Sequence, residues 1–237
     1  TFIGSFVSIE ALKNHPKVIK TVVLDKKYRV LYKTARNLGE FDYFFSFRSS
    51  LRTKFLKFLI SAKNKYQFDK NKYQHRHQVE KYNDFINDSL DINFPPGKLL
   101  LTTTNSQSST QKTVGINPGA SYGSAKRWYP EEFAKVASEL SDRYDIVIFG
   151  GPGEVDITLD IEKSLLEKGV KNYQNLAGKT TIPELINHIS NLDLFITGDS
   201  GPMHVAAAFE VPTVAIFGPT KDDETSQWMN EKSLIVK

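Results

Sequence analysis

TGDSGPMH, residues 197–204, stands between the apolar run LFI (194–196) and the alanine-rich segment VAAAF (205–209), and it decides the fold. The apolar run is typical of a buried parallel strand, and the alanine-rich segment is typical of a helix. A strand, a polar glycine turn and a helix in this order point backbone N–H groups at an anion. The stretch therefore predicts an α/β sheet with a ligand site at its edge.

Within this turn, Asp199 leaves the strand at its carboxyl end, where open α/β sheets bind ligands. Ser200 is placed to cap the helix, and Gly201 allows a ligand to approach the backbone closely. Pro202 lacks an N–H, so the amides of Ser200, Gly201 and Met203 remain to bind a sugar phosphate or a nucleotide pyrophosphate. A merely structural turn is the alternative interpretation.

A second loop of the same kind follows another short strand. The run TVGI (113–116) precedes NPGASYGSAKRW (117–128), and Pro130 then opens a helix. Lys126 supplies a point charge and Arg127 a fork of donors, both suited to phosphate. A solvated basic loop is the alternative, but two such loops after two strands of one sheet favour a phosphate site.

The two loops resemble those of the ADP-heptose:lipopolysaccharide heptosyltransferases, glycosyltransferase family 9, and are most similar to the type II enzymes. The resemblance is specific from about residue 113 to 220 and looser over residues 1–91. Other segments that carry it are FGGPGE (149–154), LAGKTT (176–181), VAIFGPT (214–220), GSFVS (4–8) and FRS (47–49).

The resemblance implies which residues bind the donor's phosphates. Ser121 and Lys126 are expected to meet them, with Lys126 also near the heptose. Ser200 and Gly201 are expected to donate backbone amides to the diphosphate.

The resemblance also implies contacts for the rest of the donor. Glu154 matches a carboxylate that binds the ribose, and Thr180 falls beside the adenine. Asp199 matches the acidic residue that binds the heptose hydroxyls. His204, one helical turn beyond the loop, either faces the same site or bonds to the scaffold.

The implied reaction is glycosyl transfer with inversion, in which Lys126 and Asp199 support catalysis. The family's general base lies in an N-terminal segment that this sequence does not contain, so the base is unknown; Asp25 and Asp42 are not convincing substitutes. We expect no cofactor, because ADP-heptose is a substrate. We expect no metal site either, because no Asp-x-Asp pair stands in a glycine loop and the acidic run DDE (222–224) is better placed to cap a helix.

The alternation of strand and helix patterns predicts an α/β protein with two Rossmann-like domains facing a cleft, the GT-B arrangement of the resembled family. We expect an N-terminal acceptor-side domain at 1–95, a linker at 96–112 and a C-terminal nucleotide-sugar domain at 113–237.

The chain starts without Met, at what resembles the second strand of the first domain, and ends where the family continues. The resemblance thus predicts a chain truncated at both ends, with the first domain incomplete. The expected strands are 18–24, 42–47, 65–68, 114–117, 146–149, 194–197 and 214–217, and the expected helices include 28–38, 50–61 and those opening at Pro130 and Thr181.

The charge is unevenly distributed along the chain. Residues 1–100 hold 19 Lys and Arg against 9 Asp and Glu, whereas residues 101–237 hold 12 against 18. A basic half attracts an anionic partner, here the phosphorylated inner core of lipopolysaccharide, with peripheral contact to a membrane surface. Candidate contacts are Arg48 and Arg52, then Lys54, Lys57 and the region 63–81. A solvated basic surface is the alternative, and we expect no nucleic acid, because the aromatic run at 42–47 favours a buried strand over a stacking platform.

Composition limits the class of protein. No apolar window is long enough to span a membrane, no signal peptide opens the chain, and there is no cysteine. We expect a cytoplasmic enzyme, peripheral at the inner face of the inner membrane of a Gram-negative bacterium. The alternatives are a related transferase with another nucleotide sugar and a non-catalytic module that binds anionic glycolipid or nucleotide.

Overall fold

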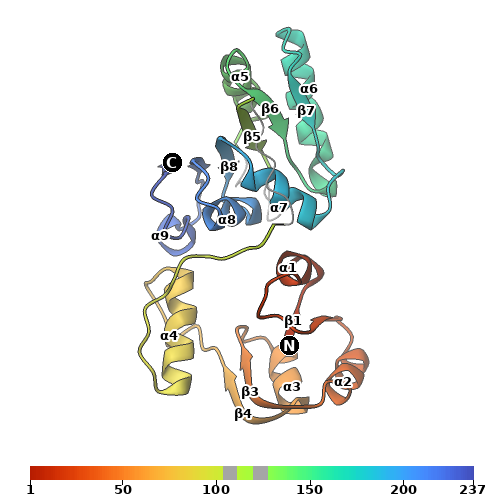
Figure 1. The fold of residues 1–237 in the computed structure, drawn as a ribbon, viewed down its shortest axis with the longest axis vertical. Coiled ribbons are helices and arrows are strands. Elements are labelled where there is room, and N and C mark those ends of the chain that lie inside the picture. The colour runs from red at the N-terminus through yellow and green to blue at the C-terminus, as the bar shows by residue number, and fades with distance from the viewer. Residues whose placement is uncertain (104–110, 120–127) are drawn as a thin grey trace. The chain divides into compact units, whose positions relative to one another are not determined.

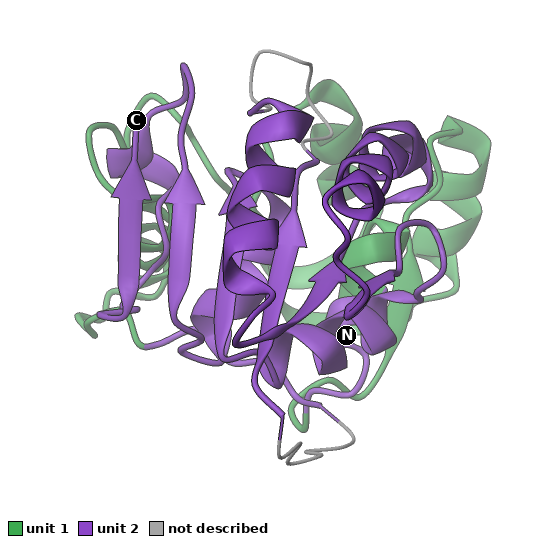
Figure 2. Ribbon diagram, turned by 90° about the horizontal axis from the view of Figure 1, so that it is seen from above, with its two compact units in different colours: residues 1–9, 16–97 green, residues 10–15, 98–237 purple. Residues whose placement is uncertain are grey.

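The computed structural model describes residues 1–103, 111–119 and 128–237. The chain divides into two compact units, coloured separately in Figure 2. Unit 1 comprises residues 1–9 and 16–97, and unit 2 comprises residues 10–15 and 98–237. The division at 97/98 falls next to the start of the predicted linker.

Unit 1 alternates short strands and helices (Figure 1). Its strands pair in parallel, β1 with β2 and β3 with β4. An apolar cluster around Ala35, Leu56 and Ile60 joins α2 and α3 to the strands. The elements are β1 (Phe2–Gly4), α1 (Phe6–Leu12, whose residues 10–12 belong to unit 2), β2 (Thr21–Val23), α2 (Tyr28–Arg36), β3 (Glu40–Ser46), α3 (Leu51–Leu59), β4 (Ser61–Gln67) and α4 (Gln78–Leu90).

Aromatic side chains connect β3 and β4 to α4. Phe45 stacks on Tyr66 with ring centroids 5.2 Å apart, and Phe85 of α4 meets both Phe45 and Phe68 edge to face. The expected strand at 42–47 is confirmed, but its burial was overestimated, because Tyr43 remains half exposed.

Unit 2 is built on one parallel sheet of six strands in the order β10-β9-β8-β5-β6-β7. Its strands are β5 (Thr113–Asn117), β6 (Asp145–Ile148), β7 (Tyr173–Asn175), β8 (Leu194–Gly198), β9 (Thr213–Ile216) and β10 (Ser233–Val236). The helical elements are α5 (Pro130–Leu140), η2 (Pro152–Glu154), α6 (Val155–Glu167), α7 (Ile182–Ser190), α8 (Gly201–Ala208) and α9 (Asp222–Thr225). The four expected strands of this half and its helices from Pro130 and Thr181 are confirmed.

Successive strand residues of this sheet contribute to two separate cores. Ile146 and Ile196 pack with α5 and α6 on one face, whereas Phe149 and Phe195 pack with α7 and α8 on the other. Alternate side chains of a strand point to opposite faces, so both faces of this sheet are covered and its central strands are mainly apolar. The sequence prediction of an α/β fold with parallel strands is confirmed.

Candidate functional site

The order in which strands are added to the sheet of unit 2 reverses at β5. The chain runs outward from β5 to β6 and β7, then returns to place β8 on the opposite side of β5. In such open sheets the ligand crevice lies at the carboxyl ends of the two strands that flank this switch point. The two loops singled out from the sequence follow β5 and β8, so the topology places both at the switch point.

A buried amide joins these two strands at their carboxyl ends. Asn117 is 2% exposed and lies in register with Thr197. Its Nδ2 donates to Thr197 Oγ1 and to Ser200 Oγ, each at 3.1 Å, and the two hydroxyl oxygens lie 3.2 Å apart. This network fixes the start of the turn after β8 relative to β5.

Ser200 stands at the N-cap position of α8, but its side chain makes no capping hydrogen bond. The prediction that its hydroxyl caps the helix is therefore wrong, because that hydroxyl is engaged by Asn117 and Thr197 instead. A Cβ added at Gly201 would meet nothing within 4 Å, so space lies beside the first turn of α8. Asp199 and His204 are half-buried next to this turn.

Glu154 reaches from the loop after β6 to the loop after β5. Its Oε2 accepts a hydrogen bond from the backbone N–H of Gly151 at 2.7 Å. A Cβ added at buried Gly119 would lie 2.1–2.4 Å from the Glu154 carboxyl atoms, so this carboxylate rests directly on the Gly119 backbone. A carboxylate accepts several hydrogen bonds, so Glu154 retains capacity for a ligand hydroxyl.

The loop after β7 runs beside the same region. The N–H of Gly178 donates to Gly150 O at 2.9 Å, and Gly178 has φ of +69°. Thr180, half-buried, follows this turn and precedes Thr181, which caps α7 by accepting a hydrogen bond from Glu184 N. The structure thus places Glu154, Thr180 and Asp199 after β6, β7 and β8, at the carboxyl ends of strands of one parallel sheet.

Two predicted donor residues, Ser121 and Lys126, lie outside the described residues. Gly119 and Trp128, at either side of that segment, are described: Gly119 touches Glu154, and Trp128 packs edge to face on Phe133 of α5 at 5.1 Å. These two described residues thus lie just after β5 and just before α5.

Of the predicted acceptor residues in unit 1, Arg48 precedes α3 and Arg52 lies in its first turn. The carbonyl of Arg48 accepts hydrogen bonds from Ser46 Oγ at 3.0 Å, from Thr53 Oγ1 at 2.8 Å and from Gln67 Nε2. The side chain of Arg48 is exposed. Arg52 Nε is buried and has no hydrogen-bond partner among the described residues.

Much of the basic region 63–81 proves to be internally neutralised. Lys63 pairs with Asp42 at 2.7 Å, Lys72 pairs with Asp88 at 2.6 Å, and Arg76 pairs with two carboxylates of α4. Hydrogen bonds from Lys72 and Tyr73 hold the pKa of Asp88 below its ordinary value. These ion pairs weaken the expectation that the region 63–81 attracts an anionic partner.

No cluster of three or more metal-ligating side chains occurs in the described parts of the chain. Across residues 1–103, 111–119 and 128–237, no helix is long and apolar enough to cross a bilayer.

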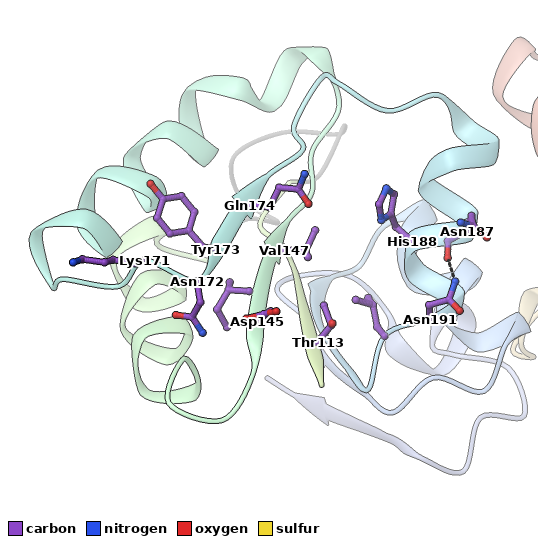
Figure 3. Close-up of a pocket in the computed structure, with 12 residues that line it drawn as sticks. Thr113, Asp145, Val147, Lys171, Asn172, Tyr173, Gln174, Asn187, His188 and Asn191 are labelled. Atoms are coloured by element: carbon purple, nitrogen blue, oxygen red, sulfur yellow. Dashed lines mark hydrogen bonds between the residues drawn. The ribbon is translucent and has the colours of Figure 1, made fainter. Parts of the chain in front are cut away.

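A hollow of about 430 Å³ opens elsewhere on unit 2 (Figure 3). Its lining includes Thr113 and Asp145, at the amino ends of β5 and β6, and the polar side chains of Asn172, Asn187 and Asn191. None of the predicted site residues lines it. The hollow and the switch point are thus distinct places, and the backbone amides of the α8 turn belong only to the second.

Asn117 and Thr197 belong to the two sequence motifs but are not among the predicted site residues. Their partnership depends on the register of two strands that lie 80 residues apart in the chain. The sequence signal that could have indicated them is a polar residue at the carboxyl end of each of two apolar strands.

Comparison with known proteins gives a consistent result. Residues 46–237 match the model of glycosyltransferase family 9 (heptosyltransferase). A relative is lipooligosaccharide heptosyltransferase 2 of Campylobacter jejuni, 43% identical over 242 residues that cover 98% of this chain and 75% of the relative.

Solved structures share the fold. A glycosyltransferase family 9 protein from Veillonella parvula superposes with a TM-score of 0.85 at 22% identity, covering 99% of this chain and 76% of its own. The ADP-heptose lps heptosyltransferase II of E. coli gives a TM-score of 0.81 at 24% identity, covering 99% of this chain and 80% of its own.

Proposed function

Because the chain belongs to glycosyltransferase family 9, we propose that it moves heptose from ADP-heptose to the inner core of lipopolysaccharide, with inversion at the anomeric carbon. The relatives are named as heptosyltransferases, and one solved neighbour is named for ADP-heptose. The partners of the chain are accordingly a nucleotide-sugar donor and a lipopolysaccharide acceptor.

The donor is assigned to the carboxyl edge of the sheet in unit 2. The turn at Ser200 and Gly201 offers backbone amides to the diphosphate, and Lys126 and Ser121 meet the same phosphates. The Asn117 network carries this assignment, because it holds the α8 turn against β5 at the switch point. A turn held in place in this way loses little conformational freedom when the ligand binds.

The sugar and base contacts follow from the same edge. Glu154 accepts hydrogen bonds from the ribose hydroxyls, and Asp199 accepts them from the heptose. Thr180 lies beside the adenine, after the neighbouring strand β7. His204 is one helical turn beyond Ser200 and is assigned to the donor side.

In the transfer step the acceptor hydroxyl attacks the anomeric carbon, a general base takes its proton, and the bond to the ADP oxygen breaks. The departing diphosphate gains negative charge. The N-terminus of α8 and Lys126 stabilise that charge by preorganised electrostatics. The proposed reaction uses neither a cofactor nor a metal ion, so a chelator should leave ADP binding unchanged.

The acceptor is assigned to unit 1. Arg48 and Arg52 lie at the N-terminus of α3, where the helix dipole also favours an anion. Their guanidinium groups suit the phosphates of an inner-core acceptor. An acceptor anchored in a membrane also requires the protein to work at the membrane surface, which agrees with the expected peripheral location.

Calorimetric titration with ADP-heptose, ADP, UDP and UDP-glucose tests the donor assignment. We expect selective binding of the adenine nucleotides, weakened by Lys126→Ala. Asp199→Asn should weaken ADP-heptose and spare ADP, because only the heptose hydroxyls contact that carboxylate.

The matched controls are Lys135→Ala and Asp160→Asn, which alter exposed residues of α5 and α6 away from this edge. If the folded chain binds uridine nucleotides as well as adenine nucleotides, the related transferase with another donor replaces this proposal. If it binds none of the four, the donor site is not at the switch point.

A further inference from the structure

The outward faces of α2 and α3 in unit 1 share an unusual composition. These helices contain six Lys and Arg residues and no Asp or Glu. On α3, Leu51 and Phe58 are 78% and 79% exposed, and exposed Lys54 lies between them. These three residues recur at helical spacing and therefore point to the same side of α3.

The neighbouring helix continues this surface. Arg29, Lys33 and Arg36 of α2 are exposed, on the side opposite buried Leu31 and Ala35.

The two helices form one surface rather than two. Tyr28 of α2 packs edge to face on Phe55 of α3, with ring centroids 5.2 Å apart, and the buried sides of both helices face the same apolar cluster. We call the six exposed residues Arg29, Lys33, Arg36, Leu51, Lys54 and Phe58 the α2–α3 face.

The cations of this face differ from Lys63, Lys72 and Arg76 of the same unit. None of the four is paired with a carboxylate among the described residues, whereas Lys63, Lys72 and Arg76 are. Arg36 instead lies over the ring of Tyr32, with its Cζ 5.2 Å from the ring centroid. The face thus keeps its full positive charge.

Helix α6 in unit 2 provides a contrast. Its exposed Leu159 and Leu166 are also seven residues apart and flank an exposed lysine, Lys163. That helix, however, carries four acidic residues and one basic residue. Exposed apolar side chains thus occur on helices of both units, but of these two surfaces the α2–α3 face is the one whose helices carry no carboxylates.

We propose that the α2–α3 face docks the protein on an anionic lipid bilayer. Leu51 and Phe58 enter the boundary between headgroups and acyl chains, and the cations of α2 and Lys54 contact the lipid phosphates. This is how helices with an apolar stripe and a basic flank lie in a membrane interface. The inference rests on the proposed function only in that a lipopolysaccharide acceptor is itself held in a membrane.

The charge complementarity favours a bilayer over a second copy of the chain, because two such faces repel each other. The two large apolar side chains favour a bilayer over a soluble polyanion such as nucleic acid. A polyanion satisfies the cations but leaves Leu51 and Phe58 in water.

Co-sedimentation of the whole chain with two kinds of vesicle tests the proposal. One is phosphatidylcholine alone, and the other is an equimolar mixture of phosphatidylcholine and phosphatidylglycerol. The variants are Leu51→Ser/Phe58→Ser and Lys33→Glu/Lys54→Glu, with Leu159→Ser/Leu166→Ser as the matched control. All these positions are exposed, so the folded state should tolerate the changes, and ADP titration checks that unit 2 is intact.

We expect binding to the anionic vesicles alone. The serine pair should weaken it roughly tenfold, the loss expected when two partly inserted apolar side chains stay in water. The glutamate pair should weaken it by more than about twentyfold, since each cation near an anionic surface contributes about fivefold. The α6 control should bind like the wild type.

Equal binding by the serine pair and the wild type would overturn the proposal, and so would the absence of vesicle binding. Tighter binding to single-stranded DNA, dependent on Lys33 and Lys54 only, would replace the bilayer with a polyanion. If the wild type binds vesicles but not ADP, the proposed donor site is wrong and the docking surface stands. Failure of the proposed function and failure of the docking proposal are therefore distinguishable.

Discussion

The carboxylate of Glu154 shows how a single glycine can make room for a charged side chain. Its carboxyl group lies on the backbone of Gly119 and is held by the N–H of Gly151. The loop after β5 therefore leaves room for a charged group from the loop after β6. Any side chain at residue 119 has to compete with that carboxylate for the same space.

Gly119→Ala should lower the affinity for ADP about tenfold, because the added methyl group displaces the Glu154 carboxylate from the position proposed for the ribose. The thermal midpoint should change little, since the atom that must move is the end of a flexible side chain. Gly153→Ala is the matched control, because a Cβ at that position meets nothing within 4 Å. Calorimetry with ADP decides, and equal affinities for the two variants would remove Glu154 from the site.

Asn117 is a buried residue that links two strand ends at the proposed donor site. Asn117→Ala removes two hydrogen bonds and leaves the hydroxyls of Thr197 and Ser200 in a mostly buried place, which should cost about 1–3 kcal/mol of the free energy of unfolding. It should also weaken ADP binding, because the α8 turn is no longer held against β5.

The control for this prediction is Asn172→Ala. Asn172 also donates two hydrogen bonds, to the carbonyls of Ser141 and Tyr144, but it lies in the loop before β7, away from the switch point. Urea unfolding should show a loss of stability in both variants, and ADP titration should show a loss only in Asn117→Ala. Unchanged ADP binding in Asn117→Ala would confine the network to a structural role.

At the scale of elements, the start of α7 is a capping box that the sequence predicted. Thr181 donates both its N–H and its hydroxyl to Glu184 Oε2, at 2.7 Å and 2.8 Å. The backbone bond, and then the hydroxyl bond, hold the pKa of Glu184 below its ordinary value. A lowered pKa in the folded state stabilises the fold above the ordinary pKa, and this stabilisation disappears as the pH falls through the folded value.

Glu184→Gln should therefore lower the thermal midpoint at neutral pH, and the difference from the wild type should shrink in acid. Glu139→Gln, at an exposed position of α5, should show no such dependence. Thermal unfolding followed by circular dichroism across the acid range checks both variants. A difference that stays constant with pH would mean that the carboxylate charge is not what stabilises the cap.

Elements with local signals could be predicted from the sequence, and those without them could not. Thr181 with Glu184 and Pro130 before an apolar pattern marked α7 and α5, and the apolar runs marked β5 and β8. Helix α4 was not predicted, because its N-cap is a histidine, His77, in a capping box with Glu80.

The site could be predicted only in part, for a related reason. Loop motifs indicated which residues are polar and exposed to a ligand. Strand register decides which of them meet, and one sequence does not contain it. The bond between Asn117 and Thr197 and the contact between Glu154 and Gly119 both depend on that register.

At the scale of the molecule, the switch point and the hollow of Figure 3 are competing places for a ligand. Hydrogen exchange of the whole chain with and without ADP separates them. We expect slower exchange at the carboxyl ends of β6, β7 and β8, around Gly151, Gly178 and Gly201, and unchanged exchange around Asn172 and Asn191. Protection centred on those two asparagines would place the nucleotide in the hollow instead.

The strand order also has a consequence for how the protein is made. β5 is the first strand of its sheet in the chain, yet it lies between β6 and β8, and Asn117 meets a partner 80 residues further on. During synthesis the chain has to wait for β8 to emerge from the ribosome before β5 is complete on both edges, a delay of several seconds at about 5–20 residues per second. Until then β5 exposes an unpaired apolar edge, which is open to chaperones and to wrong partners. The proposed nucleotide site is thus incomplete until β8 has paired with β5, and ADP retention by a nascent chain would report that pairing.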